Sequence, residues 1–162
     1  MAASRNYPST DQVVAVLSAE IGRYVEPGQS VAVGYSGGLD STVLLHGLSR
    51  MSLCMSAVHV HHGLNPAADA WVTACERRCE ALRVPLTVAR VSVERNSPDG
   101  LEAAARRARH QVFSRLATDW IVLAHHRGDR AETLVFNLLR GAGVRGAGAM
   151  RSRQGRLLRP ML

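Results

Sequence analysis

The sequence predicts an α/β fold in which a doubly wound, Rossmann-like parallel sheet carries helices on both faces. Short apolar strand patterns alternate with helical patterns along the chain, which is the order produced by consecutive β-α-β units. The chain has 162 residues, of which 46% are apolar, enough for a single domain with a full core. We therefore interpret residues 1–162 as one domain without an internal repeat or an interdomain linker.

The individual elements follow from the spacing of apolar residues. The first helical pattern has Asp11 near its start and a Pro-Gly pair at its end, and it repeats at Val13, Leu17, Ile21 and Tyr24. The later elements are strands at 30–35, 53–59, 84–93 and 120–124, and helices at 42–50, 67–82, 101–117 and 130–139. In the helix at 101–117 we expect the core to receive Ala105, Ala108, Val112 and Leu116.

The segment between the first strand and the second helix has the composition of a phosphate-binding turn: Ser36-Gly37-Gly38-Leu39-Asp40-Ser41. Glycines let the backbone approach an anion, and serine hydroxyls and helix-start N–H groups donate hydrogen bonds to it. Asp40 is itself an anion, which we interpret as a ligand of a Mg²⁺ ion that bridges it to the phosphates. The alternative is a plain turn in which Asp40 or Ser41 is an ordinary N-cap.

Two better known nucleotide-binding motifs do not apply. A Walker A loop requires a lysine, and all 20 basic side chains of this chain are arginine. The segment Gly141-Ala-Gly-Val-Arg-Gly146 matches a dinucleotide-binding pattern in its letters, but it follows a predicted helix and not a strand. We interpret it as an arginine-bearing loop.

The chain is strongly basic, with a net charge of +7 and a pI of about 10.6. After Glu132 the sequence contains only basic charges, beginning with Arg140 and Arg145. This distribution favours a polyanionic partner such as nucleic acid, although codon bias also explains arginine in place of lysine. No apolar segment indicates a membrane span or a signal peptide, and three cysteines fit a reducing, cytoplasmic location.

Loops that follow parallel strands meet at one edge of the sheet. We therefore expect one crevice to be shared by residues 36–41, 59–65, 93–100 and 125–130. His59, His61 and His62 would lie there beside a nucleotide; the alternatives are ordinary polar loop residues or a metal site. Cys75 and Cys79 lie one helical turn apart, where packing is favoured over a metal role.

Two further polar groups have a functional and a structural interpretation each. Glu102, Arg106 and Arg109 share a helix face, so Arg106 either points to phosphate or forms a solvated ion pair. Asp129 and Glu132 have the spacing of an N-cap and its N3 partner, which a capping box explains without chemistry. The same carboxylates, beside the histidines that end the preceding strand, also suit a substrate ammonium group.

These motifs, in order over nearly the whole chain, resemble the N-terminal catalytic domain of the tRNA(Ile)-lysidine synthetase family, within the N-type (PP-loop) ATP pyrophosphatases. The resemblance rests on SGGLDS at 36–41, HVHHGLNP at 59–66, EAAAR at 102–106, the block at 125–133, LRGAGVRG at 139–146 and LLRPML at 157–162. It implies a ligase that uses ATP and Mg²⁺ to adenylate C2 of the wobble cytidine in tRNA(Ile) with a CAU anticodon. L-lysine then displaces AMP to form lysidine, which changes decoding from AUG to AUA.

The resemblance also assigns roles to residues. ATP binding falls to residues 36–41 with His59, His62 and Arg106, and catalysis to Asp40, His125, Asp129 and Glu132. Lysine is expected at Asp129 and Glu132, and tRNA at Arg140 and Arg145.

The chain departs from the family pattern at two positions and in its extent. Gly128 stands where the first of two aspartates is usual, which removes a carboxylate, and Arg130 stands where glutamine is usual. We expect the family's further C-terminal tRNA-binding domains to be absent from this chain.

Two alternative functions compete with lysidine formation. One is a cytidine thiolase of the same superfamily, disfavoured by Leu39 and the lack of a CxxC motif. The other is a noncatalytic nucleotide- or RNA-binding module. The oligomeric state stays open.

Overall fold

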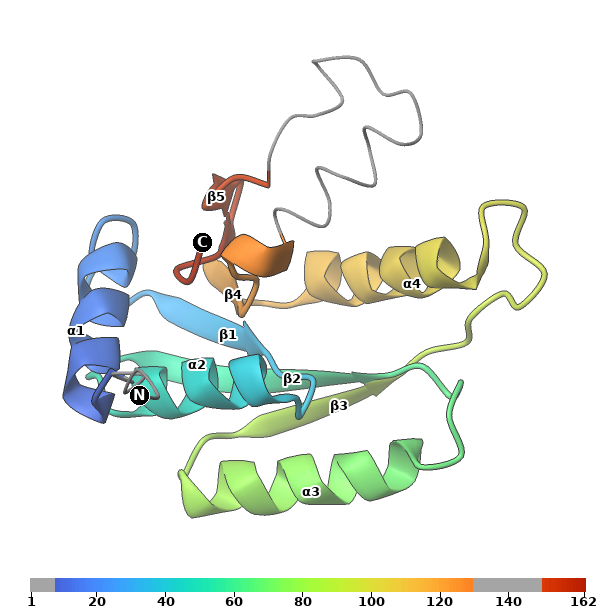
Figure 1. Ribbon diagram of the computed structural model, residues 1–162, viewed down its shortest axis with the longest axis horizontal. Coiled ribbons are helices and arrows are strands. Elements are labelled where there is room, and N and C mark those ends of the chain that lie inside the picture. Colours follow the sequence, from blue (N-terminus) through green and yellow to red (C-terminus); the bar gives the residue numbers. More distant parts are fainter. Residues whose placement is uncertain (1–7, 130–149) are drawn as a thin grey trace, which may run out of the picture.

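The fold is a layered α/β domain, seen in a computed structural model that describes residues 8–129 and 150–162 (Figure 1). Its elements are α1(Thr10–Ile21), β1(Ser30–Gly34), α2(Leu39–Ser49), β2(Cys54–His61), α3(Ala68–Ala81), β3(Leu86–Arg90), α4(Leu101–Arg115), β4(Trp120–Leu123), β5(Arg153–Gln154) and β6(Leu157–Leu158). The sheet has the strand order β3-β2-β1-β4-β6-β5. All neighbouring strands are parallel except β5, which is antiparallel to β6. The predicted α/β class is confirmed.

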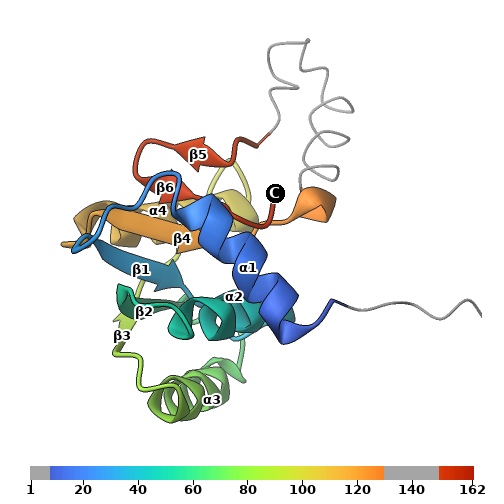
Figure 2. The same cartoon turned by 90° about the vertical axis from the view of Figure 1, so that its left-hand side faces the viewer.

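The helices cover both faces of the sheet (Figure 2). The helices α1, α2 and α3 share one buried cluster, which includes Leu17, Leu45 and Cys79. On the other face α4 inserts Phe113 into a second cluster. The strands feed both clusters, because successive side chains of a strand point to opposite faces. The central strand β1 pairs with β2 and β4, so its carboxyl end opens in the middle of the sheet edge.

The last residues of the chain belong to the sheet. Strand β6 extends the parallel order beyond β4, with Leu157 opposite Ile121. The Arg153 guanidinium lies over the rings of Tyr24 and Trp120, 5.4 and 5.3 Å from their centroids. Because β5 and β6 contain only two residues each, they have too few residues for a periodic signal.

Several boundaries differ from the prediction. Helix α2 begins at Leu39, not at residue 42, because Gly38 takes an extended conformation and serves as its N-cap. Strand β2 runs to His61, because it stays paired with β3 up to Arg90. The core contacts of α4 come from Ala104 and Phe113, whereas the residues expected there are only partly buried.

The predicted helix at 130–139 lies outside the described residues, although a helical turn already begins at Arg127. Within the described ranges, no helix combines the length and the apolar character that crossing a membrane requires.

Candidate functional site

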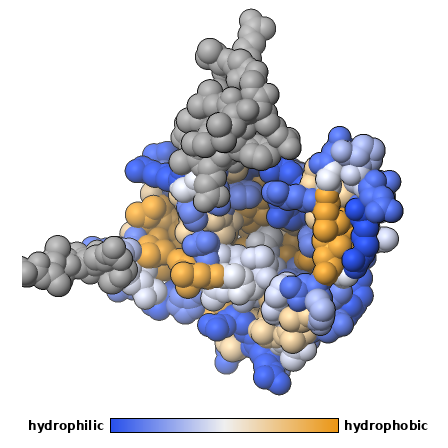
Figure 3. All heavy atoms as spheres, turned by 45° about the vertical axis from the view of Figure 1, so that its right-hand side comes forward, coloured by the Kyte–Doolittle hydropathy of each residue, from blue (hydrophilic) through white to orange (hydrophobic). Residues whose placement is uncertain are grey.

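A cavity of about 470 Å³ lies at the carboxyl edge of the sheet. Its walls come from the ends of β1, β2 and β4, the starts of α2 and α3, and one face of α4. Figure 3 brings this side of the molecule forward and shows the surface hollowed between polar and apolar residues. The cavity brings together eight of the predicted site residues: Ser36, Gly38, Asp40, Ser41, His59, His62, His125 and Asp129.

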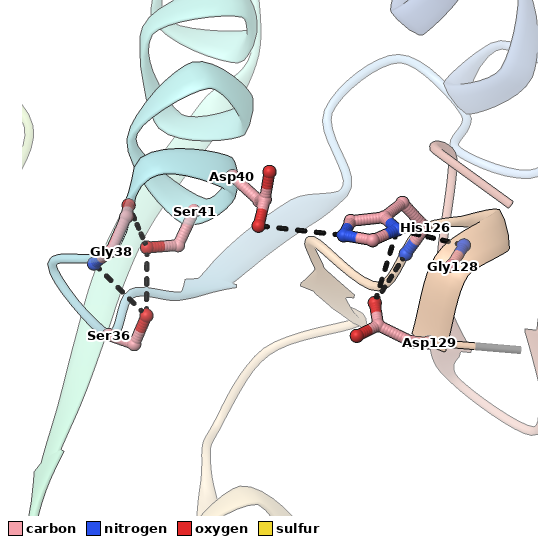
Figure 4. A network of polar contacts seen from close by, with 7 residues as sticks. All are labelled: Ser36, Gly38, Asp40, Ser41, His126, Gly128 and Asp129. Atoms are coloured by element: carbon pink, nitrogen blue, oxygen red, sulfur yellow. Dashed lines mark hydrogen bonds and ion pairs between the residues drawn. The ribbon is translucent and has the colours of Figure 1, made fainter. Parts of the chain in front are cut away.

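The phosphate-binding turn is held by its own polar groups (Figure 4). The Ser36 and Ser41 hydroxyls lie 3.0 Å apart, and Ser41 Oγ also donates to the Gly38 carbonyl at 3.0 Å. Gly38 caps α2 without a side chain, so the N–H groups of the first helical turn remain available to an anion. Gly37 has a φ of +84°, and a Cβ there would stand 2.9 Å from Cys75 Sγ. The turn therefore requires glycine at position 37.

His59 supports this turn from behind. It lies within β2, which continues two residues past the strand end expected at His59, and it is only 5% exposed. Its Nδ1 donates to the Tyr35 carbonyl at 2.9 Å, which ties the end of β1 to its neighbour. Cys75 Sγ packs 3.5 Å from the same nitrogen. Burial raises the pKa of the Cys75 thiol and that of Cys79, the latter to about 11, so both thiols are neutral packing groups.

The imidazole of His126 lies between the carboxylates of Asp40 and Asp129, two residues that line the cavity (Figure 4). Its Nε2 lies 3.7 Å from Asp40 Oδ2 and its Nδ1 lies 3.8 Å from Asp129 Oδ2. Nδ1 accepts a hydrogen bond from the Gly128 backbone N–H at 3.0 Å. Because Nδ1 accepts, the ring proton of a neutral His126 is on Nε2 and is directed towards Asp40.

These contacts change the assignment of the helix start. Asp129 Oδ2 accepts from the His126 backbone N–H at 2.7 Å, while the His126 ring accepts from the residue at N2. His126 is therefore the N-cap and Asp129 occupies N3, in a reciprocal arrangement like a capping box. The prediction that Asp129 is the N-cap is wrong by one helical turn. His126 was not singled out from the sequence; its position three residues before an aspartate is the signal that could have identified it.

Gly128, the departure from the family pattern, makes room for this arrangement. A Cβ at this position would stand 2.6 Å from Cε1 and 2.9 Å from Nδ1 of His126. A side chain here would therefore displace the imidazole from the helix start. The missing carboxylate therefore coincides with a helix start in which the His126 ring occupies the space beside Gly128, which the sequence alone did not reveal.

His125 is held as a neutral hydrogen-bond donor. Its Nδ1 accepts from Arg159 Nε at 3.2 Å, which leaves the ring proton on Nε2. Burial, with a smaller contribution from Arg159, lowers the pKa of His125 to about 4. Arg159 is 3% exposed, and its other nitrogens donate to the Arg151 carbonyl and to Gln154 Oε1. Its place in the C-terminal motif was the only sequence signal for this role.

Some of the predicted site residues do not line the cavity. Arg106 is exposed and does not line it, whereas Arg109, one turn further along α4, does. No residue of 93–100 contributes to the lining, and neither Gly37 nor Leu39 does so. The remaining predicted residues lie outside the described part of the chain: Glu132, Arg140 and Arg145.

The residues at the turn fit a magnesium ion bound chiefly through phosphate. In the ranges 8–129 and 150–162, no three His, Cys, Asp or Glu side chains converge to hold a metal by themselves. Mg²⁺ at phosphate sites commonly takes one or two carboxylates and completes its shell with phosphate oxygens and water. Asp40 is half-exposed beside the turn, and its ion-pair contact among the described residues is with the His126 ring at 3.7 Å, so its oxygens are accessible to such an ion.

Comparison with known proteins defines the class of this site. The sequence matches the family described as a PP-loop domain over residues 10–162, and the chain belongs to that family. It is 54% identical over 132 residues to the tRNA(Ile)-lysidine synthase of Aromatoleum aromaticum, which covers 78% of this chain and 31% of the relative. It is 49% identical over 146 residues to that of Xanthomonas axonopodis pv. citri, with coverages of 84% and 33%. The chain spans about a third of the length of these relatives.

Solved structures share the fold at low sequence identity. A U34-tRNA thiolase from Methanococcus maripaludis aligns with a TM-score of 0.74 and 18% identity, over 93% of this chain and 58% of that protein. An NH3-dependent NAD synthetase from Campylobacter jejuni aligns with a TM-score of 0.58 and 16% identity, over 78% and 58%. These similarities concern the fold alone.

Proposed function

We propose that this chain is the adenylating domain of a tRNA(Ile)-lysidine synthetase, which joins lysine to C2 of the wobble cytidine of tRNA(Ile). The observation that carries the proposal is that one cavity is lined both by the phosphate-binding turn and by Asp129, the carboxylate at the helix start after β4. The relatives of about 50% identity bear the name of this activity. Cytidine thiolation remains the second candidate by fold, with no residue of the cavity favouring it.

The proposed first step is transfer of adenylate to the cytidine. The cytidine O2 attacks the α-phosphorus of ATP, a new O–P bond forms, and the bond to the bridging oxygen breaks to release pyrophosphate. Residues 36–41 hold the departing pyrophosphate through backbone N–H groups and the Ser36 and Ser41 hydroxyls. Asp40 would hold Mg²⁺, which neutralises phosphate charge when bound. The Nε2–H of His125 serves as a neutral donor within the same cavity.

In the proposed second step, the lysine amine loses a proton to water and attacks C2 with its lone pair. The C–O bond to AMP breaks, and the nitrogen of the new C–N bond releases a second proton to water. Asp129 lies at the cavity wall and, with Glu132, is proposed to bind the lysine. Because Asp129 is fixed at N3 by the His126 N–H, one of its oxygens is already oriented. We further propose that Arg140 and Arg145 contact tRNA phosphates and that the reaction takes place in the cytoplasm.

The test measures pyrophosphate release from ATP in the presence of tRNA(Ile) and lysine, for this chain and for the chain fused to the C-terminal region of a relative. We expect any release to require tRNA(Ile) and repeated turnover to require lysine as well, because pyrophosphate leaves in the first step and lysine frees the enzyme in the second. We expect Asp40→Asn to lower the rate by about 10²-fold or more, as for loss of one transition-state charge contact. Glu80→Gln, which removes an exposed carboxylate from α3, is the matched control. Release that depends on a sulfur donor in place of lysine would contradict the proposal and favour the thiolase.

A further inference from the structure

Arg109 is a cation that lines the cavity and forms no ion pair with another residue of the described ranges. It lies on α4, is only partly exposed, and contributes to the cavity wall. Its Nε is buried, and no hydrogen-bond acceptor lies within reach among the residues the structure describes. His62 Nδ1, on the same cavity wall, is the other buried side-chain nitrogen of this kind in residues 8–129 and 150–162.

Other arginines in the same region are satisfied. On α4 itself, Arg107 pairs with Asp99 and also donates to Ser97 Oγ at 2.7 Å. Arg156 and Arg159 distribute their donors over carbonyl oxygens and neighbouring side chains. Within the described ranges, Arg109 has no such ion pair. Arg106 and Arg115 are exposed to water, so among the α4 arginines of the described residues Arg109 is the one with a buried nitrogen that has no hydrogen-bond partner.

The electrostatic surroundings of Arg109 call for an anion. Burial lowers the pKa of Arg109, and the neighbouring charge of Arg106 acts in the same direction. Burial, followed by Arg109 itself, also lowers the pKa of His62. A guanidinium that is partly removed from water and lacks a counter-charge is unfavourable, so an arrangement of this kind is stabilised when an anion enters. The forked donors of arginine match the oxygens of a phosphoryl group.

We propose that Arg109, assisted by His62, forms a second phosphoryl-binding subsite on the α4 side of the cavity, apart from the turn at 36–41. This inference rests on the proposed function, because it assumes a nucleotide whose terminal phosphates occupy that turn. The expected occupant is the α-phosphoryl group, which stays behind as AMP after pyrophosphate leaves. A phosphodiester of the bound RNA offers the same chemistry and is the other source.

The test compares ligands with and without a phosphoryl group. We would titrate the chain with AMP, adenosine and MgATP by calorimetry, in the parent and in Arg109→Gln. We expect AMP to bind about 10- to 100-fold more weakly to the variant, the usual effect of losing a hydrogen bond to a charged group. Adenosine affinity should stay unchanged. The Arg109→Lys variant keeps the charge but loses the forked geometry of the guanidinium. Its affinity for AMP should lie between those of the parent and of Arg109→Gln.

Matched variants separate this subsite from general charge loss. Arg115→Gln removes an exposed arginine from the same helix and should leave AMP binding as in the parent. Arg106→Gln tests the assignment expected from the sequence; a larger loss of AMP affinity there than in Arg109→Gln overturns the proposal. Circular dichroism and the thermal midpoint verify that each variant is folded.

A parallel titration with short single-stranded RNA identifies the source of the phosphoryl group. If Arg109→Gln weakens only RNA binding, the subsite stands with a phosphodiester as its ligand. If nucleotide and RNA binding are both unchanged, the subsite is refuted while the proposed function survives. If the parent itself fails to bind AMP and MgATP, the proposed function falls, and the RNA titration alone decides the subsite.

Discussion

At the scale of single residues, the imidazole of His126 links the phosphate-binding turn to the helix that starts at Arg127. One ring nitrogen caps that helix through the Gly128 N–H, and the other faces Asp40 at 3.7 Å. The contact is possible because position 128 lacks a Cβ. Gly128 and His126 therefore act as a pair, and the effect of changing either depends on the other.

This pairing gives a prediction for the stability of Gly128→Ala. Alanine is the better helix former by about 1 kcal/mol, yet we expect the substitution to be destabilising or neutral, since displacing a cap costs about 0.5–2 kcal/mol. In a His126→Ala background the same substitution should stabilise the chain, because no ring remains to be displaced. The free energy of unfolding in urea, measured over the four-variant cycle, gives the coupling. Additive effects of the two substitutions would refute the pairing.

The same cycle clarifies the role of the missing carboxylate. Gly128→Asp adds a charge but also the Cβ, so Gly128→Ala is its matched control. If the carboxylate matters for chemistry, lysine-dependent pyrophosphate release should rise by about 10- to 1000-fold in Gly128→Asp relative to Gly128→Ala, the range of electrostatic effects in a partly dry site. Equal rates would mean that Asp129 and Glu132 suffice.

His125 predicts a pH dependence of stability. Its pKa in the folded chain, about 4, lies below the ordinary value of 6.5. Between these values the unfolded chain binds a proton that the folded chain does not, so stability is full above pH 6.5 and is lost as the pH falls towards 4. The loss has an upper bound of about 3 to 4 kcal/mol, from about 1.4 kcal/mol for each unit of pKa difference. The pKa of His62 is lowered too and adds in the same direction.

The measurement is urea unfolding of the parent and of His125→Asn at several pH values from neutral to mildly acidic. We expect the parent to lose stability steadily on acidification and the variant to lose clearly less. His46→Asn, which removes an exposed histidine from α2, should retain the slope of the parent. Parallel slopes for the parent and His125→Asn would show that this histidine titrates normally.

The sequence supported only part of the site at this scale. Residues in contiguous motifs, such as Ser36 and Asp40, were predicted because a strand, a turn and a helix fix their place locally. Arg109 and Arg159 were missed because their roles depend on contacts between segments distant in sequence. The capping contacts of His126 are local and were overlooked, whereas its approach to Asp40 joins distant segments. The choice of Arg106 over Arg109 shows the limit: helical spacing gives a shared face, and only tertiary packing decides which residue turns inward.

At the scale of elements, the strand and helix types were predicted and their ends were not. Strand β2 continues to His61 because of its pairing with β3, a partner that the sequence does not specify. The C-terminal strands were missed, although they determine how α4 ends. Arg156 lies beside β6 and donates to four carbonyl groups at the end of α4 and in the segment after it, at 2.7–3.0 Å: those of Phe113, Ser114, Leu116 and Thr118.

We therefore predict that Arg156→Met destabilises the chain although it changes no residue of the cavity. Methionine keeps an unbranched apolar stem but removes all four donated hydrogen bonds. The free energy of unfolding should fall by about 2 kcal/mol, the value for charged donors in partly buried positions. Arg151→Met, at an exposed position on the same segment, should change stability by less than about 0.5 kcal/mol. Equal losses in the two variants would contradict a specific role for Arg156.

At the scale of the whole molecule, the fold was predictable because alternating strand and helix patterns leave few arrangements. Right-handed crossovers place α2 and α3 on one face and let α4 return on the other, which fixes the edge where the cavity opens. The position of β6 was not predictable, since a two-residue strand carries no period. Strand β6 extends the sheet past β4. The residue that follows it, Arg159, donates a hydrogen bond to His125 in the cavity wall.

The net charge of +7 leads to a prediction about RNA binding by the whole chain. Each arginine that neutralises a phosphate releases a counterion, so the affinity for tRNA should fall steeply as salt rises. For roughly four contacts, raising the salt from about 50 to 200 mM should weaken binding by about 10²-fold. Filter binding across a salt series measures the slope.

Two substitutions test where this charge acts. Replacing Arg140 and Arg145 by glutamine should lower the magnitude of the logarithmic salt slope by about two if both contact phosphates. Replacing Arg77 and Arg78 on α3 removes the same charge from exposed positions of another helix and should leave the slope nearly unchanged. A slope that falls equally in both double variants would mean that the chain attracts RNA through its net charge alone. A tight complex insensitive to salt would show that phosphate contacts do not dominate, because the release of counterions cannot then supply the binding free energy.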